Sequence, residues 1–266
     1  PKISIGADPM NDFSISFEYN MQNNTENDIL QLPEKIAIEK GIQIVICIDE
    51  FQQISDFEDS KTFQKKLRSV WQLQQHVSYC LFGSKKHLMN ELFEKKNLPF
   101  YKFGDAIYLA KIETKYWIEY ICKRFENTGK HISPELAEEI CRLVDNHSSY
   151  VQQLSWLLWI RTINTATTEQ LSYALEDLLD QNNILFQSET ENLSAYQMNF
   201  LKAIVDGIHT KFSSKEVISK YNLGTSANIV RLKNALLQKE LIETNGKEIV
   251  LADPVFGVWF KKEMLY

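Results

Sequence analysis

Mostly apolar stretches alternate with amphipathic stretches along the first 112 residues. From Phe13, apolar and polar residues alternate as they do in a half-buried strand. Residues 42–48 are almost all apolar and β-branched, which predicts a strand covered on both faces. The expected strands are 13–19, 42–48, 77–82 and 106–109, and the expected helices are 29–40, 61–75 and 87–95. This alternation predicts a parallel α/β sheet with right-handed crossovers.

A helical period alone follows from residue 114 to residue 179. An apolar stripe runs through residues 117–125, and Ser133-Pro134 is typical of a helix start, with a serine cap followed by a proline. Residues 151–160 and 171–179 predict two more helices. This segment therefore reads as a small all-helical module.

The last segment predicts helices at 197–208 and 227–239, with a shorter helix between them that starts at Ser213-Ser214. A β-hairpin follows, because Asn245-Gly246 is a favoured two-residue turn. Three helices and a hairpin in this order predict a winged helix-turn-helix. The fold class expected for the whole chain is thus α/β plus all-α, with domains at 1–112, 113–194 and 195–266.

The composition excludes several classes of protein. The chain has 266 residues, of which 44% are hydrophobic and 24% charged, so it has enough apolar residues for real cores and is neither disordered nor fibrous. Its apolar runs are too short to cross a bilayer and no signal peptide opens it, so we expect a cytoplasmic protein without a membrane partner.

The cysteine, histidine and tryptophan residues do not indicate a disulfide, a metal site or a cofactor site. The 4 cysteines have no close-pair spacing and the 5 histidines form no HExxH pair, which disfavours disulfides, thiolate metal sites and zinc hydrolysis. We interpret Trp156 and Trp159 as core or interdomain packing rather than as cofactor contacts.

Charge is distributed unevenly. Residues 195–266 carry 10 basic and 7 acidic residues, a net charge of +3, whereas residues 1–194 carry 19 and 28, a net charge of −9. This balance is not basic enough to establish nucleic-acid binding, and an ordinary solvated surface explains it equally well.

The most specific motif is the pair Asp49-Glu50, directly after the apolar strand at 42–48. The carboxyl ends of parallel strands face the ligand crevice of an open sheet, where one carboxylate can hold Mg²⁺ and the next can orient a water. In this hypothesis Asp49 is the metal carboxylate and Glu50 is the general base. The alternative is an acidic strand end on the surface.

Ser84 follows the next expected strand, in the sequence Phe82-Gly83-Ser84-Lys85. A polar side chain on the neighbouring strand can lie between the γ-phosphate and the water, and Ser84 is placed for this. Ordinary turn chemistry between a strand and a helix is the alternative, and on this motif alone it is the one we favour.

Taken together, these motifs resemble the archaeal-type ATPases, in the STAND branch of the AAA+ P-loop ATPases. The resemblance lies in segments similar to that family's Walker B strand, sensor 1, fifth strand, helical lid and winged helix: 44–54, 79–93, 99–112, 144–159 and 251–262. It implies an ATP- and Mg²⁺-dependent molecular switch or scaffold. By this resemblance Asp49, Glu50 and Ser84 take the magnesium, water-activating and sensor 1 roles.

The chain departs from the family pattern in two places. The family has Gly-His-Pro-Tyr where the lid packs near the adenine. Here residues 146–150 read Asn-His-Ser-Ser-Tyr, so the proline is lost, and Tyr150 is the expected adenine contact. No G-x-x-x-x-G-K-[ST] phosphate loop is present in the 266 residues. We therefore expect a fragment that lacks the first strand and helix of the sheet and binds ATP weakly or not at all.

The winged helix offers a DNA-contacting surface of modest charge. The candidate contacts are Asn228, Arg231, Asn234 and Lys247, on the third helix and beside the wing. Few basic residues accompany them, so an interdomain or protein-partner contact is the favoured alternative. Two functions thus stay open: an ATP-hydrolysing switch in the full-length protein, and a non-enzymatic DNA- or protein-binding adaptor with a vestigial nucleotide site.

Overall fold

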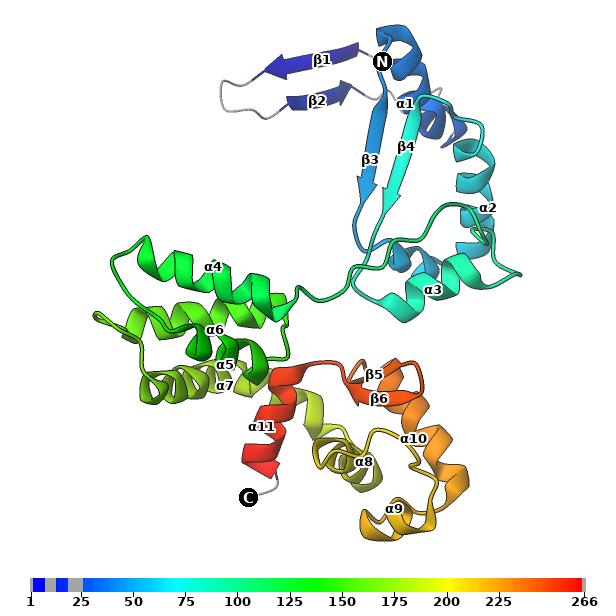
Figure 1. The fold of residues 1–266 in the computed structure, drawn as a ribbon. Coiled ribbons are helices and arrows are strands. Elements are labelled where there is room, and N and C mark those ends of the chain that lie inside the picture. Colours follow the sequence, from blue (N-terminus) through cyan, green and yellow to red (C-terminus); the bar gives the residue numbers. More distant parts are fainter. Residues whose placement is uncertain (1, 8–12, 19–25, 265–266) are drawn as a thin grey trace. The chain divides into compact units, whose positions relative to one another are not determined.

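The computed structural model describes residues 2–7, 13–18 and 26–264, which belong to two units, Pro1–Tyr108 and Leu109–Tyr266 (Figure 1). No helix among the described residues is long and apolar enough to cross a membrane. The first unit contains β1 (Lys2–Ala7), β2 (Phe13–Glu18), α1 (Glu26–Lys40), β3 (Ile44–Ile48), η1 (Phe51–Asp56), α2 (Ser60–Trp71), β4 (Val77–Leu81) and α3 (Lys86–Glu94).

The central feature of the first unit is the parallel pair of β3 and β4, in the register Ile44↔Val77 to Ile48↔Leu81. Both strands and the crossover helix α2 between them confirm the βαβ pattern expected from the sequence. β2 confirms the strand expected from Phe13 and pairs antiparallel with β1, which was not expected; Tyr19 lies outside the described residues.

Two expectations for this sheet are wrong. The strand at 42–48 is not covered on both faces, because Val45 is 66% exposed and Cys47 is also exposed. Within the first unit, α1 contacts both strands of the β3–β4 pair and packs against α2. Residues 106–109 form no strand, since no described strand pairs with them, and Ile107 is 85% exposed.

An aromatic core fixes the segment that follows β3. Phe51 contacts Phe100 edge-on with ring centroids 5.4 Å apart, and Trp71 of α2 stacks on Tyr79 of β4 at 4.1 Å. Phe51 is 5% exposed and Phe100 is fully buried. Offset and edge-to-face aromatic pairs add about 0.5–1.5 kcal/mol each to the free energy gained by burial. The residues beside Asp49-Glu50 are therefore anchored.

The second unit starts with a helical lid made of α4 (Thr114–Glu126), α5 (Pro134–Leu143), α6 (Ser148–Arg161) and α7 (Thr168–Glu191). The Ser133 side chain accepts a hydrogen bond from the Leu136 amide and Pro134 lies in the first turn, so the expected cap of α5 is confirmed. Trp159 packs against the hydrophobic core, as expected, whereas Trp156 is 56% exposed and does not belong to it. Interdomain packing of Trp156 stays a prediction.

The C-terminal elements confirm the winged helix. They are α8 (Ala195–Val205), α9 (Lys215–Lys220), α10 (Ser226–Gln238), β5 (Ile242–Asn245), β6 (Glu248–Leu251) and α11 (Pro254–Met264). The hairpin pairs Asn245 with Glu248, so its two loop residues are Gly246 and Lys247 rather than Asn245-Gly246. Gly246 takes a φ of 61° at the first loop position, which a glycine adopts at little cost.

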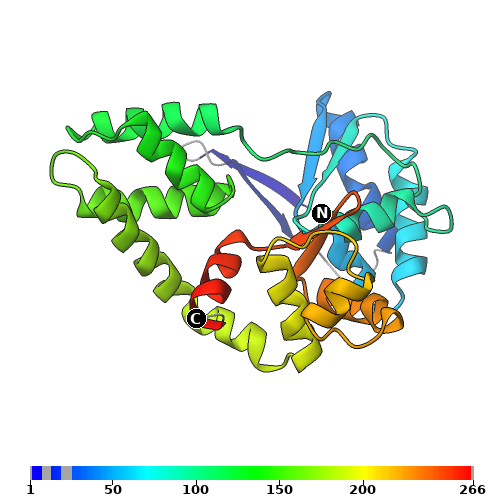
Figure 2. The same cartoon turned by 60° about the horizontal axis from the view of Figure 1, so that its bottom comes forward.

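α11 packs the end of the chain against α7, beside which it lies in both views (Figures 1 and 2). Phe256 and Trp259 are 1% exposed and contact Phe186 of α7, and the Trp259 indole Nε1 donates to Asn183 Oδ1 at 2.8 Å. Lid and winged helix therefore share one continuous hydrophobic core. The boundary expected at residue 194 stays a prediction.

Candidate functional site

The carboxyl ends of β3 and β4 bring together residues far apart in the sequence. Ser84 Oγ donates a hydrogen bond to Glu50 Oε1 at 3.0 Å. The structure thus places two of the predicted site residues in contact, and Asp49 is the residue that joins Glu50 to β3. This contact follows from the parallel pairing, because both strands end at the same edge of the sheet.

The backbone turns sharply at Glu50. Its φ of 49° and ψ of 38° are left-handed, and its amide donates to Asp49 Oδ1 at 2.7 Å. Beyond this turn the Phe51 amide donates to the Phe82 carbonyl at 3.0 Å, and the Phe82 amide donates to the Ile48 carbonyl at 3.1 Å. The chains that carry Glu50 and Ser84 are therefore bonded to each other on both sides of the turn.

Gln52 is a third member of this site, and the sequence reasoning missed it. The residue is 1% exposed and its Nε2 donates to Glu50 Oε2. Its Oε1 has no hydrogen-bond partner among the described residues. A Cβ placed on Gly83 would lie 1.9 Å from that oxygen, so glycine at this position leaves room for the buried amide.

The hydrogen bonds change the acidity of Glu50. The Ser84 hydroxyl first, and then the Gln52 amide, hold the pKa of the Glu50 carboxyl below its usual range, and Lys85 adds a smaller attraction. The carboxylate is therefore ionised and has a fixed orientation at neutral pH. An anionic side chain held by two donors can orient a water or contribute to a cation site.

The acidic side chains at this strand end suit Mg²⁺, which takes some of its ligands from substrate and water, better than they suit a metal bound by side chains alone. Mg²⁺ is usually held by one or two carboxylates together with substrate phosphates and waters, and Asp49 supplies one carboxylate at the end of β3. No group of three or more His, Cys, Asp or Glu side chains within the described part of the chain is arranged to hold a metal. Phosphate oxygens would have to complete such a site, and the sequence has no phosphate-loop motif to bind them.

Tyr150, the predicted adenine contact, belongs to the second unit. The side chain is 8% exposed, and its hydroxyl donates to Asp253 Oδ2 at 2.5 Å. Burial, followed by the Asp253 carboxylate, raises the pKa of the Tyr150 phenol. The hydroxyl thus joins the lid to the start of α11, and a contact of Tyr150 with adenine stays a prediction.

The four candidate DNA contacts differ in accessibility. Arg231, Asn234 and Lys247 are exposed, and no ion pair within the described residues involves Arg231. Asn228 is half-buried, and its Nδ2 donates to the Leu223 carbonyl at 3.0 Å. Its amide therefore stabilises the turn before α10, while Arg231 is free to meet a phosphate or a carboxylate.

Comparison with known proteins supports this architecture. A family model described as a probable winged helix domain matches residues 184–262. Among solved structures, the Walker-type ATPase PABY2304 of Pyrococcus abyssi is similar over 92% of this chain and 72% of its own, with a TM-score of 0.69 and 16% identity. The chain has an AAA+-type fold with a C-terminal winged helix. At this identity the likeness shows the fold alone.

Two further solved structures are similar at lower scores. The ORC2 protein of Aeropyrum pernix, in complexes with ADPNP and ADP, has a TM-score of 0.46 and 13% identity over 94% of this chain and 73% of its own. The RuvB Holliday junction branch migration motor of Thermotoga maritima has a TM-score of 0.43 and 13% identity over 91% of this chain and 76% of its own. A search of curated proteins gave no significant match.

Proposed function

We propose that this chain forms the Walker B, sensor 1, lid and winged-helix portion of an ATP-dependent switch of the STAND type. The observation that supports it is the Ser84–Glu50 hydrogen bond at the joined ends of β3 and β4. Adjacent carboxylates and a hydroxyl at this edge of a parallel sheet are the groups that nucleotide hydrolysis needs beside the γ-phosphate. No phosphate-loop motif occurs in the 266 residues. The proposed activity therefore requires that a phosphate-binding loop is present together with this chain.

Each residue has a distinct role in this proposal. Bound Mg²⁺-ATP would supply the electrophilic phosphorus and the charge neutralisation. The Asp49 carboxylate lies directly after β3 and would bind the cation through a water molecule. Glu50, kept ionised and oriented by Ser84 and Gln52, accepts a hydrogen bond from the attacking water. Ser84 positions Glu50 through its hydroxyl, and with ATP bound the same hydroxyl would be available to contact the γ-phosphate.

Manganese can test the cation site on this chain directly. Mn²⁺ replaces Mg²⁺ at carboxylate sites and broadens the NMR signals of nearby amides, even when binding is weak. We expect low concentrations of Mn²⁺ with ATP to broaden the amides of residues 49–50 and 83–85 first. Asp49→Asn should abolish this broadening, whereas Asp105→Asn, at an exposed position outside the site, should preserve it. Equal broadening of other acidic segments would refute the role of Asp49.

A nucleic-acid adaptor is the second candidate, and the exposed Arg231, Asn234 and Lys247 favour it. In that case a labelled DNA duplex should bind with an affinity that falls with salt and is about tenfold lower in Arg231→Ala. Lys262→Ala, in the last turn of α11, is the matched control because it removes an exposed charge elsewhere. Binding that both variants weaken equally would indicate general electrostatic attraction and refute a specific contact through α10.

A further inference from the structure

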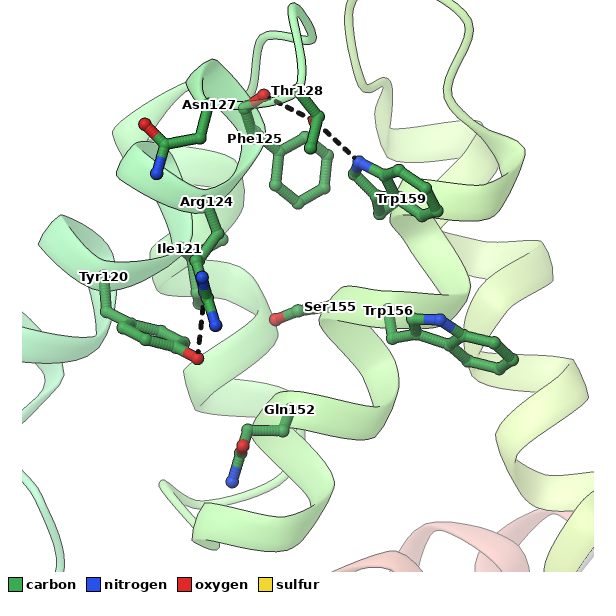
Figure 3. Close-up of a pocket in the computed structure, with 10 residues that line it drawn as sticks. All are labelled: Tyr120, Ile121, Arg124, Phe125, Asn127, Thr128, Gln152, Ser155, Trp156 and Trp159. Carbon is green, nitrogen blue, oxygen red and sulfur yellow. Dashed lines mark hydrogen bonds between the residues drawn. The ribbon is translucent and has the colours of Figure 1, made fainter. Parts of the chain in front are cut away.

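The lid carries an aromatic cleft between α4 and α6, remote in sequence from the acidic strand ends (Figure 3). Its volume is about 530 Å³, within the range typical of ligand pockets. Ile121 and Phe125 are among the residues that line it, but each is 2% exposed and belongs to the lid core. Figure 3 shows Tyr120 and Arg124 on α4 across the gap from Ser155 on α6.

The rim of the cleft is aromatic and partly held in place. Tyr120 is 42% exposed and Trp156 is 56% exposed. Trp159 is fixed on two sides: its Nε1 donates to Thr128 Oγ1 at 2.8 Å, and Lys130 Nζ lies 3.9 Å from the ring centroid. Exposed aromatic side chains gathered around a hollow are typical of a recognition surface, and a fixed ring loses little entropy on binding.

Charge gives the cleft a preference for anions. None of its lining residues is acidic, although the whole chain has a net charge of −6. Arg124 Nε donates to the Tyr120 hydroxyl at 3.3 Å and its guanidinium lies 5.4 Å from the Tyr120 ring centroid. No carboxylate among the described residues forms an ion pair with Arg124. A carboxylate from outside could therefore bind the guanidinium without displacing an internal partner.

We infer that this cleft binds a peptide segment that presents an apolar side chain next to an Asp or Glu. The apolar side chain packs against the exposed ring of Tyr120 at the rim of the cleft, and its neighbouring carboxylate pairs with Arg124. A nucleic acid fits less well, because phosphate-driven binding draws on several cations and this cleft offers Arg124 with Lys130 nearby. The inference is independent of any nucleotide chemistry at the strand ends.

Selection from a displayed library of random short peptides tests the inference, because it requires no natural partner to be identified first. The wild-type chain should enrich sequences in which Asp or Glu adjoins an aromatic or aliphatic residue. Arg124→Glu should lower the affinity of the selected peptides at least tenfold. Lys123→Glu makes the same charge change at the preceding exposed residue, which does not line the cleft, and should leave the affinity within twofold. Tyr120→Ala removes the apolar rim and should also weaken binding, with an unchanged thermal melt.

Three results would each overturn the inference. The first is a selection that enriches no acidic–apolar pair. The second is equally tight binding of the selected peptides to Arg124→Glu and to wild type, and the third is an equal loss of affinity in Lys123→Glu. An oligothymidylate single strand serves as the competing ligand. If it binds more tightly than the selected peptides and Arg124→Glu abolishes that binding, the cleft is a nucleic-acid site instead.

Discussion

Ser84 Oγ lies 3.0 Å from Glu50 Oε1, although the two residues are 34 positions apart in the chain. Ser84 lies just after β4, and Glu50 lies just after the neighbouring strand β3. The bond is the largest cause of the lowered pKa of Glu50, and the Gln52 amide is the next largest. The hydrogen bond between these two strand ends thus keeps the Glu50 carboxylate ionised and fixes its orientation.

Replacing Ser84 with Ala should raise the pKa of Glu50 toward its ordinary value, because the largest stabilisation of the carboxylate is lost. Carboxyl-carbon NMR titration of both proteins measures this pKa directly. Glu139 of α5, whose pKa is lowered by its hydrogen bonds with Arg142, is the internal control and should titrate identically in both proteins. An unchanged Glu50 titration would show that Ser84 does not act on the carboxylate.

Gly83→Ala should destabilise the first unit by about 1–2 kcal/mol, because the new methyl group meets the buried Gln52 amide. The loss should include the hydrogen bond from Gln52 to Glu50. Urea unfolding measures the free energy, and Gly104→Ala is the control because no atom lies within 4 Å of its Cβ position. Equal effects of the two substitutions would rule out the clash with Gln52.

Gln52 and Gly83 also show what could not be predicted from the sequence. The contact between Glu50 and Ser84 could be predicted because each follows an apolar strand, and the ends of parallel strands meet at one edge. The roles of Asp49, Glu50 and Ser84 stay predictions. Gln52 could not be predicted, because it is a polar residue buried in a short 3₁₀ turn that has no apolar period. A glycine at position 83 was the only signal, and its meaning depends on a contact between two strands.

The errors in the fold have a similar physical origin. Residues 106–109 have a strand-like apolar pattern, but a strand also needs a neighbour, and none of the described strands pairs with them. Trp156 belongs to the apolar run 156–160, yet it is 56% exposed at the aromatic cleft, because the buried face of α6 passes through Val151, Leu154 and Leu158. The winged helix was predictable because caps, turns and helical periods are local signals.

Glu34 links α1 to the segment before β4 and should make stability depend on pH. Its carboxylate accepts from the Gln75 amide at 3.1 Å, the His76 amide at 3.0 Å and the His76 ring at 2.8 Å. These bonds, the His76 ring first, lower the pKa of Glu34, although partial burial opposes them. A lowered folded-state pKa stabilises the protein above the unfolded pKa, and the stabilisation is lost as pH falls through the folded value.

Glu34→Gln should therefore lower the melting temperature at pH 7, and the difference from wild type should shrink below about pH 4, where the unfolded carboxyl binds its proton. Melting curves across this range measure the effect. Glu39→Gln, on the same helix with a side chain 70% exposed, is the control and should show little difference at any pH. A deficit in Glu34→Gln that persists unchanged at low pH would contradict the charge-based explanation.

Tyr150→Phe should destabilise the second unit by about 1–3 kcal/mol, because it leaves Asp253 without its buried donor. Asp253 Oδ1 also accepts from the Val255 and Phe256 amides and so caps α11. A double-mutant cycle with Asp253→Asn should give a coupling energy, whereas Tyr173→Phe, 50% exposed on α7, should be nearly neutral. Additive effects would mean that the Tyr150–Asp253 bond does not join lid to winged helix.

Nucleotide turnover with Glu50→Gln tests the central claim most directly, in a protein that supplies the phosphate-binding loop. Our account predicts that ATP still binds, that hydrolysis falls at least about 100-fold, and that ATP rather than ADP stays on the protein. Glu58→Gln should turn over at the wild-type rate. Hydrolysis by Glu50→Gln at the wild-type rate would contradict the account, and no hydrolysis by the wild type would favour the adaptor.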